Sequence, residues 1–202
     1  MILQLFEQNP NQKNIDKTIE ILREGGIIIY PTDTVYAMGC DALNVRAIEK
    51  ICKIKGLNPQ KKRLSIICHD LSNISEYAKV SNAVFKVMKR NLPGPFTFIL
   101  NATNSLPKIF KNRKEVGIRI PNNNITLTLV KELGNPLLTT SVRDKDQWGE
   151  YSIDPELIEE EYGEIVDLIV DGGYGGLEPS TVVNCTNDEI EILRQGKGIL
   201  IE

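Results

Sequence analysis

The sequence predicts an α/β protein built on one open, mixed β-sheet with helices packed against it. Segments with helical spacing of apolar residues alternate with short apolar runs of strand length, a pattern typical of α/β folds. Of the 202 residues, 41% are hydrophobic and 25% are charged, so the chain can bury a full core. No repeat, linker or low-complexity tract divides it, and we expect residues 1–202 to form a single domain.

The helices are predicted from apolar residues that recur three or four positions apart. The first is expected at 14–24, where Ile15, Ile19 and Leu22 share one face and two glycines follow. The same spacing predicts further helices at 44–55, 81–90, 126–133 and 155–162.

The strands are predicted from short apolar runs bounded by polar residues, glycine or proline. These runs lie between the helices rather than in one block, which favours a sheet that mixes parallel and antiparallel neighbours. Strands are expected at 27–30, 64–68, 96–100, 117–120, 137–141, 168–171, 181–184 and 190–194.

Charge is distributed unevenly, although the formal net charge is only −3. Residues 46–63 hold seven basic side chains against one acid, and residues 144–178 hold twelve acids against one lysine. Both segments fit solvated helix faces, and the basic segment fits equally well a basic mouth that attracts nucleotide or RNA phosphates.

The cysteines and the single histidine argue against several common kinds of site. Cys40, Cys52, Cys68 and Cys185 are scattered without a CxxC pair, so we interpret them as buried free thiols rather than zinc or redox ligands. His69 ends a predicted strand and fits a structural histidine better than a catalytic base. Without a GxSxG motif, hydrolase chemistry of the Ser-His-Asp type is not expected.

The N-terminus has no signal-peptide pattern, and no apolar run approaches the ~18 residues of a membrane span. We therefore expect a cytoplasmic protein that does not bind membranes.

Polar clusters follow several predicted strands, at positions where α/β proteins commonly bind ligands. None is specific alone, and neither a Walker phosphate loop nor a Rossmann glycine fingerprint is present. The segment 30–39 has the composition of a hydroxyl-rich turn that precedes a helix. The clusters are YPTDTVYAMG at 30–39, Lys55-Gly56, PGPFTF at 93–98, GIRIP at 117–121, LLTTS at 137–141, PSTVV at 179–183 and LRQG at 193–196.

Arg119 lies inside one of these apolar strands. A buried guanidinium needs an anionic partner, because leaving it unpaired is costly. The partner is either an internal carboxylate or the phosphate or carboxylate of a ligand.

The order of these clusters is more specific than any one of them. From about residue 12 to 198 the series resembles the YrdC/YciO family of threonylcarbamoyl-AMP synthases, and it is most similar to the YciO branch. The resemblance implies an open, twisted α/β sheet with a large basic cavity. Longer family members carry a further C-terminal domain, which we do not expect here.

The resemblance also implies a reaction. L-threonine, bicarbonate and ATP are joined into threonylcarbamoyl-adenylate and pyrophosphate, the activated intermediate for modifying an adenosine beside the anticodon of certain tRNAs. ATP acts as a substrate, and magnesium is expected with it. No tightly bound cofactor is expected, and no carboxylate cluster stands out as a metal site.

By the same resemblance, three cations are expected to act in catalysis: Lys55, Arg119 and Arg194. The side chains expected to contact substrate are Thr32, Tyr36, Thr97, Ser141 and Ser180. Attack of a carbamate on an α-phosphate gathers negative charge, so such a site needs cations and hydrogen-bond donors more than a covalent nucleophile.

Two departures separate this chain from the synthases it resembles. Synthases carry Lys-x-Arg where this chain has Leu57 as the third residue, and Ser-x-Asn where it has Arg143. Loss of a guanidinium beside the phosphates weakens transition-state stabilisation. We therefore expect a threonylcarbamoyl-AMP synthase-like nucleotidyltransferase of weak or altered activity.

The alternative function is a protein that binds double-stranded RNA or tRNA without synthase activity. Phosphate contacts on the basic segment would supply the affinity. The residues expected to bind RNA are Lys50, Lys53, Lys61, Lys62 and Arg63.

Overall fold

A computed structural model describes residues 1–58, 63–111, 114–142, 153–187 and 189–202. Its helices are α1 (Gln12–Arg23), α2 (Val45–Ile54), α3 (Ile74–Tyr77), α4 (Asn82–Asn91), α5 (Lys108–Lys111), α6 (Asn124–Leu133) and α7 (Pro155–Tyr162). Its strands are β1 (Ile2–Gln4), β2 (Ile28–Tyr30), β3 (Ala37–Asp41), β4 (Ser65–Ile67), β5 (Ala78–Lys79), β6 (Phe96–Ala102), β7 (Glu115–Arg119), β8 (Leu137–Ser141), β9 (Leu168–Asp171), β10 (Thr181–Asn184) and β11 (Glu191–Arg194).

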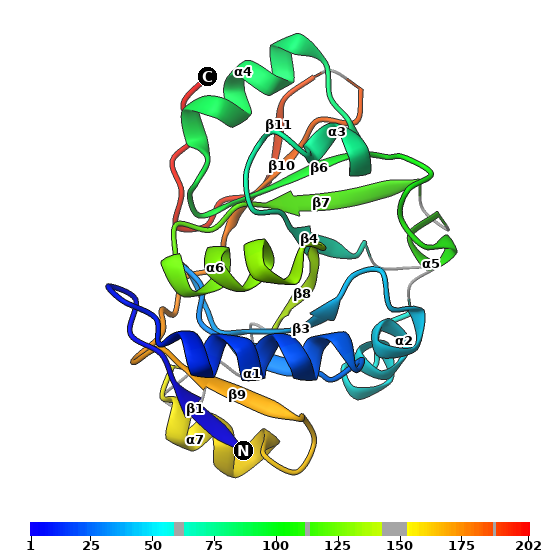
Figure 1. Cartoon of the computed structure of the whole chain (residues 1–202). Coiled ribbons are helices and arrows are strands. Elements are labelled where there is room, and N and C mark those ends of the chain that lie inside the picture. Colours follow the sequence, from blue (N-terminus) through cyan, green and yellow to red (C-terminus); the bar gives the residue numbers. More distant parts are fainter. Residues whose placement is uncertain (59–62, 112–113, 143–152, 188) are drawn as a thin grey trace.

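The described strands form one open sheet in the order β1-β9-β2-β3-β8-β4-β7-β6-β10-β11, with β5 paired to β6. Strands β1 and β2 run parallel to β9, β4 runs parallel to β7, and β10 runs parallel to β6. The other pairs are antiparallel. The sheet is therefore mixed, and the N-terminal and C-terminal strands lie at its two edges (Figure 1).

Short polar side chains start the principal helices. Asn11, Asn44, Ser81 and Asn123 each accept a hydrogen bond from a backbone N–H in the first turn of α1, α2, α4 and α6. These caps satisfy donors that a helix N-terminus otherwise leaves open. Gly134 ends α6 with φ of +79°, a conformation that glycine adopts at little cost.

Two apolar clusters lie on opposite faces of the sheet, because successive strand residues point to opposite faces. Ile28 and Tyr30 of β2 pack into the cluster beneath α1 and α6, whereas Ile29 packs into the larger cluster that includes α2 and α4. Figure 1 shows α1 and α6 side by side on one face of the sheet. Within the described part of the chain, no helix is long and apolar enough to cross a membrane.

The alternation of helices and strands is confirmed, with boundaries that differ by at most two residues from the expected ranges. The prediction that segment 30–39 is a turn before a helix needs correction. The turn leads into strand β3, which pairs with β2 and β8. The sequence analysis also missed β1, β5, α3 and α5, which are short.

Candidate active site

A cavity of about 460 Å³ opens on the sheet face that α1 and α6 partly cover. Along β8, Leu137 packs beneath these helices, and Thr139 and Ser141, which share its face, line the cavity. Along β4, Ile67 packs beneath the helices and Ser65 lines the cavity. The sheet face that is apolar beneath α1 and α6 thus continues as the polar lining of the cavity.

Arg119 is the buried cation of the cavity. Its Nη2 donates to Thr34 Oγ1 at 2.9 Å and lies 3.4 Å from Asp33 Oδ1. Its Nε is buried and has no hydrogen-bond partner among the described residues. An internal carboxylate is therefore present, but one buried donor of the guanidinium is left without a partner among the described residues.

The turn that leads into β3 holds these partners in place. Thr32 Oγ1 donates to the Val35 carbonyl at 2.7 Å and accepts from the Thr34 N–H at 3.1 Å. Asp33 Oδ2 accepts from the Asn122 N–H at 3.0 Å. Thr32 therefore shapes the turn that presents Thr34 and Asp33 to Arg119, and it does not itself line the described cavity.

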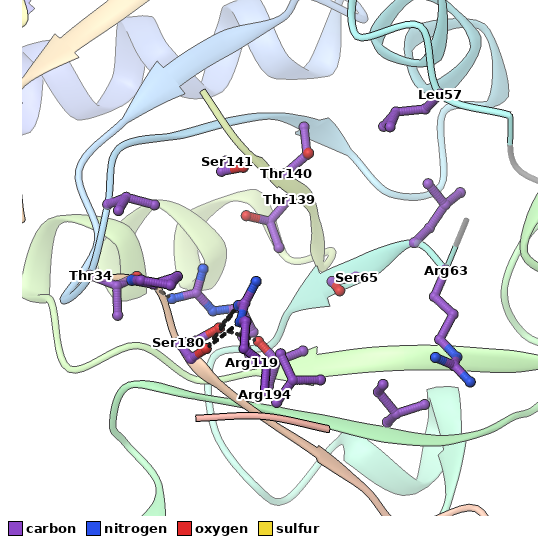
Figure 2. Close-up of a pocket in the computed structure, with 16 residues that line it drawn as sticks. Thr34, Leu57, Arg63, Ser65, Arg119, Thr139, Thr140, Ser141, Ser180 and Arg194 are labelled. Carbon is purple, nitrogen blue, oxygen red and sulfur yellow. Dashed lines mark hydrogen bonds between the residues drawn. The ribbon is translucent and has the colours of Figure 1, made fainter. Parts of the chain in front are cut away.

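Arg194 reaches the same end of the cavity from β11. Its Nη2 and Nε donate to the Ser180 carbonyl at 2.8 and 3.2 Å. The Ser180 hydroxyl lies 2.8 Å from Thr97 Oγ1, and both side chains are buried. Figure 2 shows Arg119, Arg194 and Ser180 gathered on one side of the cavity.

The two guanidiniums affect each other electrostatically. Burial lowers the pKa of Arg119, and the negative charge of Asp33 opposes that effect. Burial also lowers the pKa of Arg194, and the positive charge of Arg119 adds to this shift. Two like charges in a partly buried site favour the binding of an anion between them.

Leu57 and Arg63 lie on the opposite side of the cavity (Figure 2), and Leu64, the neighbour of Arg63 in the chain, also lines it. Leu57 is half-buried and packs against the larger apolar cluster. Arg63 Nε donates to Glu115 Oε2, which pairs its charge within the protein. Of the three arginines that line the described cavity, only two lie at the Ser180 side.

Five of the predicted site residues are brought together: Thr97, Arg119, Ser141, Ser180 and Arg194 line the cavity. Tyr36 and Lys55 do not line the described cavity. The Tyr36 hydroxyl donates to the Gly173 carbonyl at 2.7 Å and accepts from the Gly172 N–H at 3.1 Å. Lys55 Nζ donates to the Val142 carbonyl at 2.9 Å, directly beyond β8.

Of the residues predicted to bind RNA, Lys50 and Lys53 are exposed on α2, and Arg63 is engaged by Glu115. Lys61, Lys62 and Arg143 lie outside the described residues.

Sequence reasoning missed Asp33, Thr34, Ser65 and Thr139. The first two stand in the cluster at 30–39, but only the fold brings them to Arg119, about 85 positions further along the chain. Ser65 and Thr139 could have been found from side-chain alternation, since each shares a face with a buried apolar residue of its own strand.

The remaining candidates take structural positions. All four cysteines are buried and none forms a disulfide, as predicted, and burial raises the pKa of Cys68 to about 12. His69 Nδ1 lies 3.2 Å from the Leu127 carbonyl of α6. Among the described residues, no three His, Cys, Asp or Glu side chains gather as metal ligands.

Comparison with known proteins agrees with this fold. Residues 20–196 match the Sua5/YciO/YrdC family model, which is described as "telomere recombination". The chain belongs to this family.

Named relatives include both branches of the family. The uncharacterized protein YciO of Escherichia coli is 42% identical over 196 residues, which cover 96% of this chain and 94% of that protein. A crystal structure of E. coli YciO matches with a TM-score of 0.90 and 39% identity over 98% of this chain and 97% of that chain. A putative threonylcarbamoyl-AMP synthase of Methanocaldococcus jannaschii is 33% identical over 201 residues, or 96% of this chain and 92% of that protein.

A structure of Sua5 from P. abyssi, complexed with L-threonine, also matches this chain. The TM-score is 0.85 and the identity 26%, and the match covers 97% of this chain and 57% of that chain. The fold is therefore shared with a protein whose structure is complexed with this amino acid.

Replacing Tyr36 by phenylalanine tests whether its hydroxyl is structural. The change leaves the Gly172 N–H and the Gly173 carbonyl without their partner, so we expect the free energy of unfolding to fall by about 1–2 kcal/mol. Any affinity for L-threonine or AMP should stay within about threefold of the original. Urea denaturation and calorimetry measure the two effects.

The matched control is Tyr174→Phe, because the Tyr174 side chain is exposed. This variant should change neither quantity. A tenfold loss of L-threonine affinity in Tyr36→Phe at unchanged stability would instead make the hydroxyl a substrate contact.

Proposed function

We propose that this protein is a threonylcarbamoyl-AMP synthase-type nucleotidyltransferase that serves tRNA threonylcarbamoyladenosine modification. The observation that carries the proposal is the pair of adjacent guanidiniums, Arg119 and Arg194, at one end of a cavity lined with hydroxyl groups. The buried, unpaired Nε of Arg119 supports a ligand anion at that end. The family and its synthase-named members support the class of reaction.

The reaction has two bond-forming steps. The amino group of L-threonine attacks the carbon of bicarbonate, and loss of water leaves a carbamate. A carbamate oxygen then attacks the α-phosphorus of ATP, the bond from that phosphorus to the bridging oxygen breaks, and pyrophosphate leaves. Negative charge accumulates on the α-phosphoryl oxygens during the second step.

The cavity supplies the groups that this second step requires. Arg119 and Arg194 stabilise the phosphoryl charge, and no protein nucleophile takes part. The hydroxyls of Thr97, Ser141 and Ser180 orient the substrates by hydrogen bonds. We assign L-threonine as the amino acid substrate because the related Sua5 is complexed with it.

Magnesium would enter with the ATP phosphates. The described side chains include no cluster of acidic, histidine or cysteine ligands that fits a protein-held ion. The stabilising roles are therefore assigned to the two arginines and the hydroxyl groups.

Arg194→Ala tests the proposed reaction. Removal of a charged donor from the phosphoryl site should lower kcat/KM for pyrophosphate release by about 10²–10³-fold, and Arg194→Lys should recover part of the loss. Formation of threonylcarbamoyl-adenylate from ATP, L-threonine and bicarbonate is followed by mass spectrometry.

Lys89→Ala serves as the control, since Lys89 is exposed on α4. It should retain the original activity. The proposal is contradicted if the unmodified protein forms no adenylate and binds neither AMP nor ATP at millimolar concentration.

A second candidate function is binding of double-stranded RNA or tRNA through α2. Arg46, Lys50 and Lys53 are exposed and spaced four and three positions apart, so they form one ridge of the helix. In the described part of the chain, none of the three takes part in an ion pair. Their charges are therefore available to phosphate groups.

Neutralising the ridge with Lys50→Gln and Lys53→Gln tests this function. If both lysines contact phosphates, the slope of log affinity against log salt should become about 1.5–2 units shallower. Lys86→Gln with Lys89→Gln on α4 is the control with the same change of charge. An equal loss of RNA affinity in both double variants would mean that binding depends only on the net charge of the protein. That result would contradict a site on α2.

A further inference from the structure

The cavity distributes its charge unevenly between its two sides. On the Ser180 side, Arg119 and Arg194 are adjacent, and Asp33 offsets only one of their charges. On the Leu57 side, the Arg63 charge is paired with Glu115. Among the described residues, net positive charge therefore lies at one side alone.

The positively charged side is small and well defined. Arg119 has a side chain that is 9% exposed, and its position is fixed by Asp33 and Thr34. Arg194 is held by two hydrogen bonds to one carbonyl, that of Ser180. Guanidiniums that are fixed in this way bind a phosphate without a further loss of side-chain entropy.

Among the described residues, those at the other side offer a phosphate little stabilisation. Leu57 and Leu64 present apolar side chains there, and binding a phosphate to Arg63 would require breaking its ion pair with Glu115. Lys55, the other cation near this side, gives its Nζ to the Val142 carbonyl and does not line the described cavity. A desolvated phosphate placed at this side would gain no unpaired cation from the part of the chain that the structure describes.

We propose that this cavity binds a nucleotide through a single phosphate group, as a nucleoside monophosphate or acyl-adenylate, in preference to a nucleoside triphosphate. The proposal rests on the function proposed above and narrows its ligand to the adenylate side of the reaction. The phosphate of an acyl-adenylate carries one negative charge, which the net charge of about +1 at the arginine side balances, and a monophosphate ester carries about −1.5 to −2 at neutral pH, of which that side balances a part. Every further phosphate adds negative charge that would have to extend beyond that side.

The hydroxyl-rich lining suits the same ligand. Thr97, Thr139, Thr140 and Ser141 line the cavity and offer it neutral donors and acceptors. Such groups match a ribose or a carbamoyl group rather than a second polyanion. The protein would then retain an acyl-adenylate more firmly than it binds ATP, which makes it a better holder of the activated intermediate than a producer of it.

Calorimetry of the unmodified protein with AMP, ATP and pyrophosphate tests the proposal. The titrations are made with a chelator present, so that magnesium does not neutralise the triphosphate. We expect AMP to bind at least as tightly as ATP. Pyrophosphate at 1 mM should not displace bound AMP.

Leu57→Arg tests the cause of this preference. An added guanidinium at the apolar side should raise ATP affinity at least tenfold and leave AMP affinity within about threefold. Leu57→Gln, which removes the same apolar contact without adding charge, should leave the ratio of the two affinities unchanged. Melting temperatures establish that both variants are folded.

Two results would count against the proposal in different ways. ATP binding tenfold or more tightly than AMP to the unmodified protein would overturn the preference and leave the proposed function standing. Binding of neither nucleotide would overturn both. Since the first comparison needs no substitution, it does not depend on the stability of a Leu57 variant.

Discussion

The burial of the Arg119 guanidinium is the constraint on which the site depends. Its charge requires partners, and these come from the turn before β3, where Thr34 and Asp33 meet its Nη2. The same turn is also joined to the C-terminal segment, because Lys197 Nζ donates a hydrogen bond to the Asp33 carbonyl at 2.6 Å. Segments from both ends and the middle of the chain are therefore held together around one cation, which lines the cavity and whose buried Nε has no partner among the described residues.

The cavity exists because one sheet face changes character along its strands. Where α1 and α6 cover the face, residues such as Leu137 and Ile67 are apolar. Two positions away on the same strands, Thr139 and Ser65 are polar and the covering helices have ended. The period-two alternation of a strand thus builds core and binding site from the same elements.

Much of this arrangement could be predicted from the sequence, because it is encoded locally. The spacing of Ile15, Ile19 and Leu22 predicts α1, and the apolar run around Arg119 predicts β7. Strand β3 was missed because Ala37–Asp41 includes a glycine and follows a hydroxyl-rich turn. Its pairing with β8 joins residues about 100 positions apart, which no local pattern reveals.

Local sequence patterns also could not predict the side-chain partners of the site residues. The sequence left two possible partners for the Arg119 guanidinium, an internal carboxylate or a ligand. In the structure Asp33 is the internal partner, and Nε has no partner among the described residues. The pairing of Arg63 with Glu115 removes a charge that the sequence alone assigns to an RNA surface. Such pairings depend on tertiary contacts rather than on spacing, so they decide which cations remain available for a ligand.

A crystal structure of the protein with AMP tests the central claim most directly. The account predicts that the phosphate lies between Arg119 and Arg194, with an oxygen about 3 Å from Arg119 Nε. It also predicts that the Arg63 ion pair with Glu115 stays intact. An AMP phosphate bound instead at Arg63, with Arg119 Nε out of its reach, would contradict the account.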